Sequence, residues 1–99
     1  MSRSTENKEK AILIGLILNG EQRHEIIEQL NELKRLTFTA GALPLDTIIQ
    51  NRNKPEPATF VGKGKLDIIK NQASELKCKL IIFNNETSPS QLKNIQKYI

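Results

Sequence analysis

The chain has 99 residues, 37% of them hydrophobic and 26% charged, which is typical of one globular domain with a single core. The longest apolar run, residues 11–18, is far shorter than the ~20 residues that cross a bilayer. No small-residue cleavage site of a signal peptide follows it, so we expect a cytoplasmic protein without a membrane span. The net charge of +4 is compatible with a polyanionic partner but does not identify one.

The first part of the sequence predicts a lead-in, a strand and a helix. Residues 1–10 are polar and have nothing to bury, so we expect a flexible segment there, followed by one α/β domain over residues 11–99. The uninterrupted apolar run 11–18 is typical of a strand that is covered on both faces in a parallel sheet. Apolar residues at helical spacing from Glu25 to Leu36 then predict a helix with a charged outer face.

A second strand is predicted over Leu43–Gln50. It contains the polar residues Asp46 and Thr47, which favour a position at the edge of the sheet. The segment 51–57 that follows carries two prolines and no apolar residue, so it should be an exposed connection. We expect residues 60–61, Phe-Val, to fix the end of this connection to the core.

Two more helices and a third strand complete the predicted order. The spacing of apolar residues becomes helical again after Gly62-Lys63-Gly64-Lys65, so this tetrapeptide is predicted to begin a helix. Leu80–Phe83 is predicted to be a buried strand. Ser88 can then cap the last helix, Pro89 suits its first position, and Gln91 can complete a capping box. The alternation predicts a three-layer α/β fold with a small parallel sheet in the order two-one-three, cut short before a further strand.

The tetrapeptide Gly62-Lys63-Gly64-Lys65 is the strongest local signal for a binding site. Free N–H groups and the dipole at a helix start favour anions, and the glycines would let a phosphate approach the backbone closely. Lys63 and Lys65 add positive charge, and Arg52 and Lys54 in the preceding loop could extend the basic surface. A phosphate or an RNA backbone is the expected ligand. In the alternative reading, the glycines only permit a tight turn and both lysines point into water.

No catalytic residue and no metal ligand is predicted. A Walker A loop needs Ser or Thr after its Gly-Lys pair, whereas Lys65 is followed by Leu66, so this segment is not expected to hydrolyse a nucleotide. Cys78 is the single cysteine and has no cluster with which to hold zinc. His24 has no nucleophile at an informative spacing. Asn84-Asn85 occupies the place where a receiver domain would need a phosphate-accepting acid.

Four stretches of the sequence together resemble one known family. The most characteristic are Pro57–Leu66, Pro-Ala-Thr-Phe-Val-Gly-Lys-Gly-Lys-Leu, and Leu80–Gln91, which ends in Ser-Pro-Ser-Gln. Ala11–Leu16 and Leu36–Ala42 supply an opening strand and a Thr-Ala-Gly-Ala turn in the same order. The chain thereby resembles the N-terminal domain of HflX-type ribosome-associated GTPases over nearly its whole length. It departs from the family at Asn84–Glu86, where the family usually has an acid near the start of the turn.

The resemblance implies a function that belongs mainly to a longer protein. A helical hairpin and a GTPase domain would follow these residues, and GTP and magnesium would bind there, with no cofactor in this segment. The implied partners are the large ribosomal subunit with its rRNA and the protein's own GTPase domain. The complete protein would bind the large subunit and split or rescue ribosomes. This segment is then expected to dock the complete protein on rRNA and to regulate it. Two alternatives remain open, an ATP-binding RNA-remodelling domain and a structural regulator of the GTPase domain.

Overall fold

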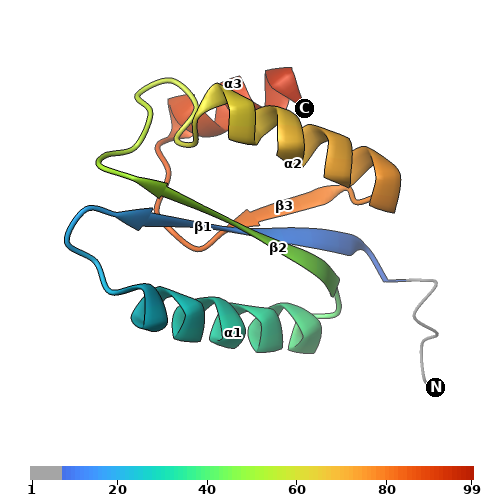
Figure 1. The fold of residues 1–99 in the computed structure, drawn as a ribbon. Coiled ribbons are helices and arrows are strands. Elements are labelled where there is room, and N and C mark those ends of the chain that lie inside the picture. The colour runs from blue at the N-terminus through green and yellow to red at the C-terminus, as the bar shows by residue number, and fades with distance from the viewer. Residues whose placement is uncertain (1–7) are drawn as a thin grey trace.

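Strands and helices alternate along the chain, as the computed structural model shows for residues 8–99 (Figure 1). Residues 1–7, which belong to the predicted lead-in, lie outside the described residues. The strands form a parallel sheet in the order β2-β1-β3, so the predicted α/β class and strand order are confirmed. The elements are β1 (Lys10–Leu18), α1 (Arg23–Thr39), β2 (Leu43–Arg52), α2 (Lys63–Leu76), β3 (Leu80–Phe83) and α3 (Pro89–Tyr98).

Three elements are longer than the sequence predicts. Strand β1 already begins at Lys10, and α1 continues past Leu36 to Thr39, because the backbone leaves the helical region only at Gly41, whose φ is 103°. Strand β2 continues to Arg52, since β1 offers backbone partners along its whole length. Arg52 is therefore the last residue of a strand and does not lie in the loop where it was predicted.

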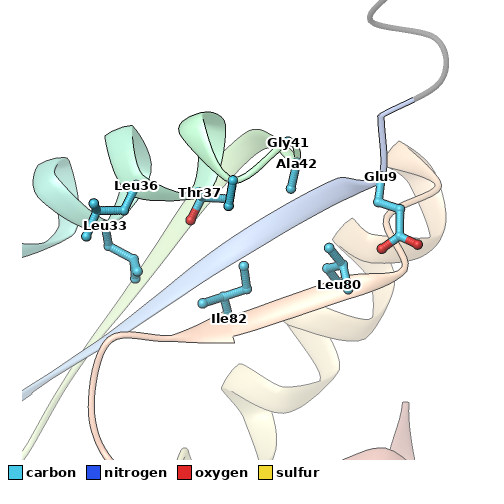
Figure 2. A pocket seen from close by; sticks show the side chains of 9 residues that line it. Glu9, Leu33, Leu36, Thr37, Gly41, Ala42, Leu80 and Ile82 are labelled. Carbon is cyan, nitrogen blue, oxygen red and sulfur yellow. The ribbon is translucent and has the colours of Figure 1, made fainter. Parts of the chain in front are cut away.

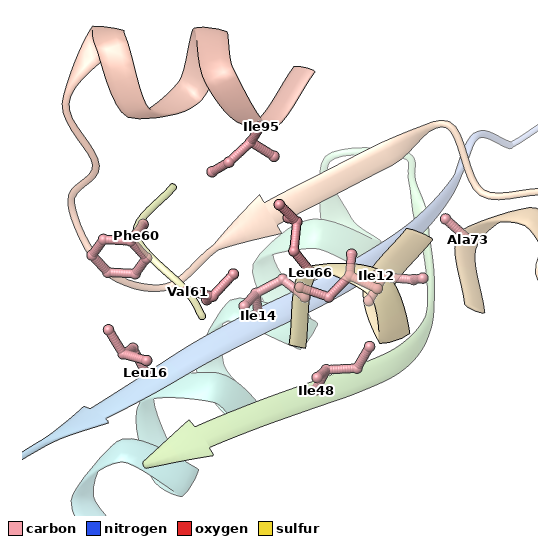
Figure 3. Packing of buried hydrophobic residues seen from close by; sticks show 10 residues of the cluster. Ile12, Ile14, Leu16, Ile48, Phe60, Val61, Leu66, Ala73 and Ile95 are labelled. Carbon is pink, nitrogen blue, oxygen red and sulfur yellow. The ribbon is translucent and has the colours of Figure 1, made fainter. Parts of the chain in front are cut away.

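Strand β1 is the buried centre of the sheet, with α1 on one face and α2 and α3 on the other (Figure 1). Its residues 11–17 are all buried, as expected for an apolar strand between two neighbours and two helical layers. The smaller apolar cluster lies under α1 and is built from Ile17, Ile26 and Leu30. The larger cluster lies under α2 and α3 (Figure 3) and contains Ile12, Ile14, Leu16, Ile48, Phe60, Val61, Leu66, Ile69, Ala73 and Ile95.

The two outer strands differ from each other in length and polarity. Strand β2 lies at an edge and contains Asp46 and Thr47, so its predicted edge position is confirmed. The prediction of a buried third strand is wrong, because all four residues of β3 are only half-buried. Strand β3 has β1 on one side and, within residues 8–99, no strand on the other. None of the helices described is long and apolar enough to cross a membrane.

Candidate phosphate-binding surface

Helix α2 begins inside the tetrapeptide Gly62-Lys63-Gly64-Lys65, called the GKGK segment below, as predicted. Gly62 is the N-cap residue and has no side chain that could accept a hydrogen bond. The first helical bond joins the N–H of Leu66 to the carbonyl oxygen of Gly62 at 2.9 Å. The N–H groups of Lys63, Gly64 and Lys65 precede that bond, and no side chain caps them. These donors at the positive end of the helix dipole can bind an anion.

The two glycines of the GKGK segment are not there to adopt a left-handed backbone. Gly62 has φ −65° and ψ 156°, and Gly64 lies within the helix. The residue with a left-handed backbone shortly before the segment is Phe60, with φ 67°. A Cβ atom at Gly62 would lie 2.7 Å from Nη1 of Arg52, and one at Gly64 would meet nothing within 4 Å. Neither glycine is therefore required by a left-handed backbone. Gly62 allows an arginine to lie against the backbone, and Gly64 leaves the first turn of α2 open.

Arg52 is held beside the helix start. Its Nε donates a hydrogen bond to the carbonyl oxygen of Lys54 at 3.1 Å, and its Nη2 lies 3.6 Å from Oε2 of Glu56. From the same strand, Oε1 of Gln50 accepts a hydrogen bond from the N–H of Gly62 at 2.9 Å. Arg52 is thus a positioned cation whose charge Glu56 partly neutralises.

The mobile positive charge of this surface comes from Lys54, Lys63 and Lys65. Lys54 and Lys63 are exposed and Lys65 is half-buried. Neither of the ion pairs found within residues 8–99 involves any of the three. An ammonium group on a flexible stem can neutralise a phosphate without a fixed geometry. Of the six residues predicted for the site, the four of the GKGK segment form the start of α2 and Arg52 lies against Gly62. Lys54 is joined to them through its carbonyl oxygen, which accepts from Arg52.

Two polar residues of α3, which the sequence does not assign to the site, hold the chain that leads into it. Nε2 of Gln91 donates hydrogen bonds to the carbonyl oxygens of Glu56 and Pro57, at 3.1 and 3.3 Å. Nδ2 of Asn94 donates to the carbonyl oxygen of Ala58 at 2.9 Å. The two most characteristic stretches of the sequence, Pro-Ala-Thr-Phe-Val-Gly-Lys-Gly-Lys and Ser-Pro-Ser-Gln, thus form one structural unit.

The GKGK segment does not fit a GTP–magnesium site. Leu66 stands where a Walker A loop has its hydroxyl, and it is buried in the core at 1% exposure, so no side chain there can reach the metal. Residues 8–99 contain no cluster of histidine, cysteine and acidic side chains that could hold a metal ion. His24 is exposed on α1. Burial raises the pKa of the Cys78 thiol, which lowers its reactivity as a nucleophile.

The asparagines at the end of β3 have a structural role. Oδ1 of Asn85 accepts from the N–H of Leu16 at 2.9 Å, and its Nδ2 donates to the carbonyl oxygen of Leu16 at 3.1 Å. The N–H of Asn84 donates to the carbonyl oxygen of Ile14 at 2.8 Å. The Asn85 side chain therefore pairs with β1 as a strand backbone would. A carboxylate could not donate the second bond, which explains why an amide suits this position.

Known proteins match the chain along its whole length. Residues 27–99 match the family described as GTP-binding GTPase N-terminal. All 99 residues align with the GTPase HflX of Flavobacterium psychrophilum at 37% identity, and 91 residues align with that of Lacrimispora saccharolytica at 38%. The GTPase HflX of Escherichia coli is 28% identical over 89 residues. The chain covers 24%, 21% and 20% of these relatives, respectively, so it spans a quarter of their length or less.

Proposed function

Because the chain belongs to the GTP-binding GTPase N-terminal family of HflX proteins, we propose that it docks such a GTPase on the RNA of the large ribosomal subunit. In this proposal GTP hydrolysis and magnesium binding, which drive ribosome splitting or rescue in the cytoplasm, belong to the rest of a longer protein. The present domain positions and regulates that activity. The uncapped start of α2, between Lys63 and Lys65, is the observation that carries the proposal.

The distribution of charge supports a phosphate-rich partner. Residues 40–99 contain nine lysines and arginines against five acidic residues, whereas residues 1–39 contain six of each. The net charge of +4 therefore comes from the part of the chain that includes the GKGK segment and α3. A positive potential concentrated on one part of a domain orients its approach to a polyanion. RNA would thus meet the α2–α3 layer of the sheet rather than α1.

The chemistry of the surface favours recognition of the RNA backbone over recognition of bases. Three backbone donors, an open approach at Gly64 and the nearby lysines suit phosphate oxygens. Base stacking needs exposed aromatic rings, but Phe60 is buried and Phe83 packs edge-on against it, with ring centroids 5.7 Å apart. The exposed Phe38 belongs to α1, on the opposite side of the sheet. Tyr98 is half-buried near Lys63; its hydroxyl donates to Asp67, and the ammonium group of Lys70 lies over its ring. We therefore expect binding that depends on RNA shape and charge.

Co-sedimentation with large ribosomal subunits at several salt concentrations tests this proposal. Each contact between a lysine and a phosphate that is lost lowers the magnitude of the slope of log K against log salt by roughly one. Lys63→Ala combined with Lys65→Ala should weaken binding and lower that slope by about two. Lys34→Ala combined with Arg35→Ala removes the same charge from α1 and should leave the slope unchanged. The site assignment is wrong if both double variants behave alike.

A further inference from the structure

Three lysines recur at intervals of seven residues along α2. Lys63 and Lys70 belong to the helix, Lys77 follows its last residue, and all three are exposed. Seven residues make almost two full turns, so the three lie on one side of the helix. The row extends over roughly 21 Å, at 1.5 Å for each residue. The GKGK segment thus supplies the first cation of a row that continues to the other end of α2.

Tyr98 of α3 shows which side of α2 carries this row. The Nζ atom of Lys70 lies 5.2 Å from the centre of the Tyr98 ring, and the same residue borders a hollow together with Lys63. The Tyr98 hydroxyl donates a hydrogen bond to Asp67, the acidic residue between the two lysines. The row therefore lies on the side of α2 next to α3, and the Asp67 carboxylate is directed to Tyr98.

The carboxyl end of the row borders a basic cleft. The cleft has a volume of about 380 Å³, and its lining includes Lys70, Lys77, Lys79 and the hydroxyl residue Ser74. No acidic residue of the described part of the chain lines it. Glu75 projects about 140° away from Lys70 around the helix axis. The two ion pairs that the structure describes include none of these lysines, so their charges are available to a ligand.

The lysines at this end are not required to cap the helix. The N–H of Lys77 donates to the carbonyl oxygen of Ser74 at 3.3 Å, and the N–H of Cys78 donates to that of Ala73 at 2.8 Å. Lys77 has the left-handed backbone that often ends a helix, with φ 58°. Glycine and asparagine adopt this conformation at a lower cost. A lysine at this position therefore favours a role for its charge.

A hollow on the opposite side of the sheet has different chemistry (Figure 2). It lies between α1 and β3, has a volume of about 620 Å³ and is bordered by apolar residues such as Leu33, Leu36 and Ile82. Among the residues that the structure describes, Glu9 is the only charged one in its lining. A polyanion would be repelled there and attracted to the cleft at the end of α2.

We propose that double-helical RNA lies along this row, with phosphates bound at the start of α2 and in the cleft at its end. The proposal rests on the phosphate-binding role given above to the GKGK segment. Double-stranded RNA is recognised by its backbone and shape, whereas single strands are usually bound by stacking bases on open aromatic rings. Lys70 covers the ring of Tyr98. The rigid helix also holds its two ends at a fixed separation, which suits a duplex whose phosphates are fixed as well.

Binding of the chain to two RNA probes tests the choice of partner. One probe is a duplex of about 16 base pairs, and the other is one of its strands alone, with a sequence that does not fold on itself. Fluorescence anisotropy measures both affinities at the same salt concentration. The duplex should bind at least about tenfold more tightly. Equal affinities, a preference for the single strand, or no binding of either probe would overturn the proposal.

Two substitutions in the cleft test the second phosphate site. Lys77→Asn combined with Lys79→Gln removes two charges, and asparagine tolerates the left-handed backbone of position 77. This variant should bind the duplex more weakly and lower the magnitude of the slope of log K against log salt by about two. Lys77→Arg combined with Lys79→Arg keeps both charges and should bind at least as tightly as the wild type.

Two further double variants distinguish failure of this proposal from failure of the proposed function. Lys34→Ala combined with Arg35→Ala removes the same charge from α1 and should leave duplex binding unchanged. The cleft is not a phosphate site if its variant behaves like this control while Lys63→Ala combined with Lys65→Ala still weakens binding. That result would leave the role of the GKGK segment intact. If neither the cleft variant nor the Lys63 and Lys65 variant loses affinity, both proposals are wrong.

Discussion

Helices α2 and α3 lie on the same face of the sheet but begin in opposite ways. At the start of α3, Oγ of Ser88 accepts from the N–H of Gln91 at 3.1 Å, and Oε1 of Gln91 accepts from the N–H of Ser88 at 2.9 Å. Pro89 occupies a first-turn position. At the start of α2, Gly62 offers no acceptor and the first-turn N–H groups remain uncapped. One start is closed by its own side chains, and the other is left open.

The difference shows where each helix obtains its stability. A good N-cap contributes about 1 kcal/mol to stability. This contribution matters for α3 because Ile95 is its one fully buried residue. Helix α2 lacks the cap but buries Leu66, Ile69 and Ala73, and burial of such side chains contributes roughly 1.5–3 kcal/mol for each of the two larger ones. Packing therefore holds α2 in place while its amino-terminal donors stay available for a ligand.

The largest loss of stability is expected on substitution of Gln91, whose side chain connects the start of α3 to the chain that leads into α2. Gln91→Ala removes the capping box and both bonds to the chain before α2, and should lower the free energy of unfolding by about 2–3 kcal/mol. Urea denaturation measures it. Gln91→Glu keeps an acceptor for the N–H of Ser88 but loses the donors, so it should fall between the wild type and the alanine variant. A loss no greater than that of Ser88→Ala would show that the bonds to the chain before α2 contribute nothing.

A smaller loss is expected at the α3 cap alone. Ser88→Ala removes the acceptor for the N–H of Gln91 and should destabilise the domain by about 1 kcal/mol. Ser88→Asp retains an acceptor and should recover most of the difference. Thermal unfolding of the three proteins provides the measurement. Indistinguishable melting curves would mean that the capping box does not limit the stability of α3.

The smallest expected effect has the opposite sign and lies at the open start. A Cβ atom at Gly64 would meet no neighbour within 4 Å, and the backbone there is helical. Gly64→Ala should therefore stabilise the domain by roughly 0.5–1 kcal/mol. Gly20→Ala also has open space, but its φ of 89° should make that variant destabilising. If both variants shift the urea midpoint in the same direction, the assigned backbone conformation at one of them is wrong.

The sequence predicts the features that depend on neighbouring residues. Ser88, Pro89 and Gln91 form a local pattern with a known geometry, and the GKGK segment stands at a change of apolar spacing, so both helix starts could be located. The half-exposure of β3 could not be predicted, because an apolar run of four residues looks the same whether one neighbour strand covers it or two.

The contacts that shape the site arise between residues far apart in the chain. The side chain of Arg52 lies against Gly62 because β2 continues to Arg52, beyond the predicted end of the strand at Gln50. The pairing of β2 with β1 sets that length. Gln91 and Asn94 reach carbonyl groups more than thirty positions earlier. Only the packing of α3 beside α2 brings these groups together, and no local pattern encodes that packing.

Binding of the Gly64→Ala variant to large ribosomal subunits tests the central claim most directly. The variant should fold more stably than the wild type, yet a methyl group would obstruct phosphate at the open turn, and we expect its affinity at fixed salt to fall about tenfold, or ~1.4 kcal/mol. The lysines are untouched, so the salt dependence should change little. Unchanged affinity in a variant that is more stable would contradict the assignment of the α2 start as the phosphate-binding surface.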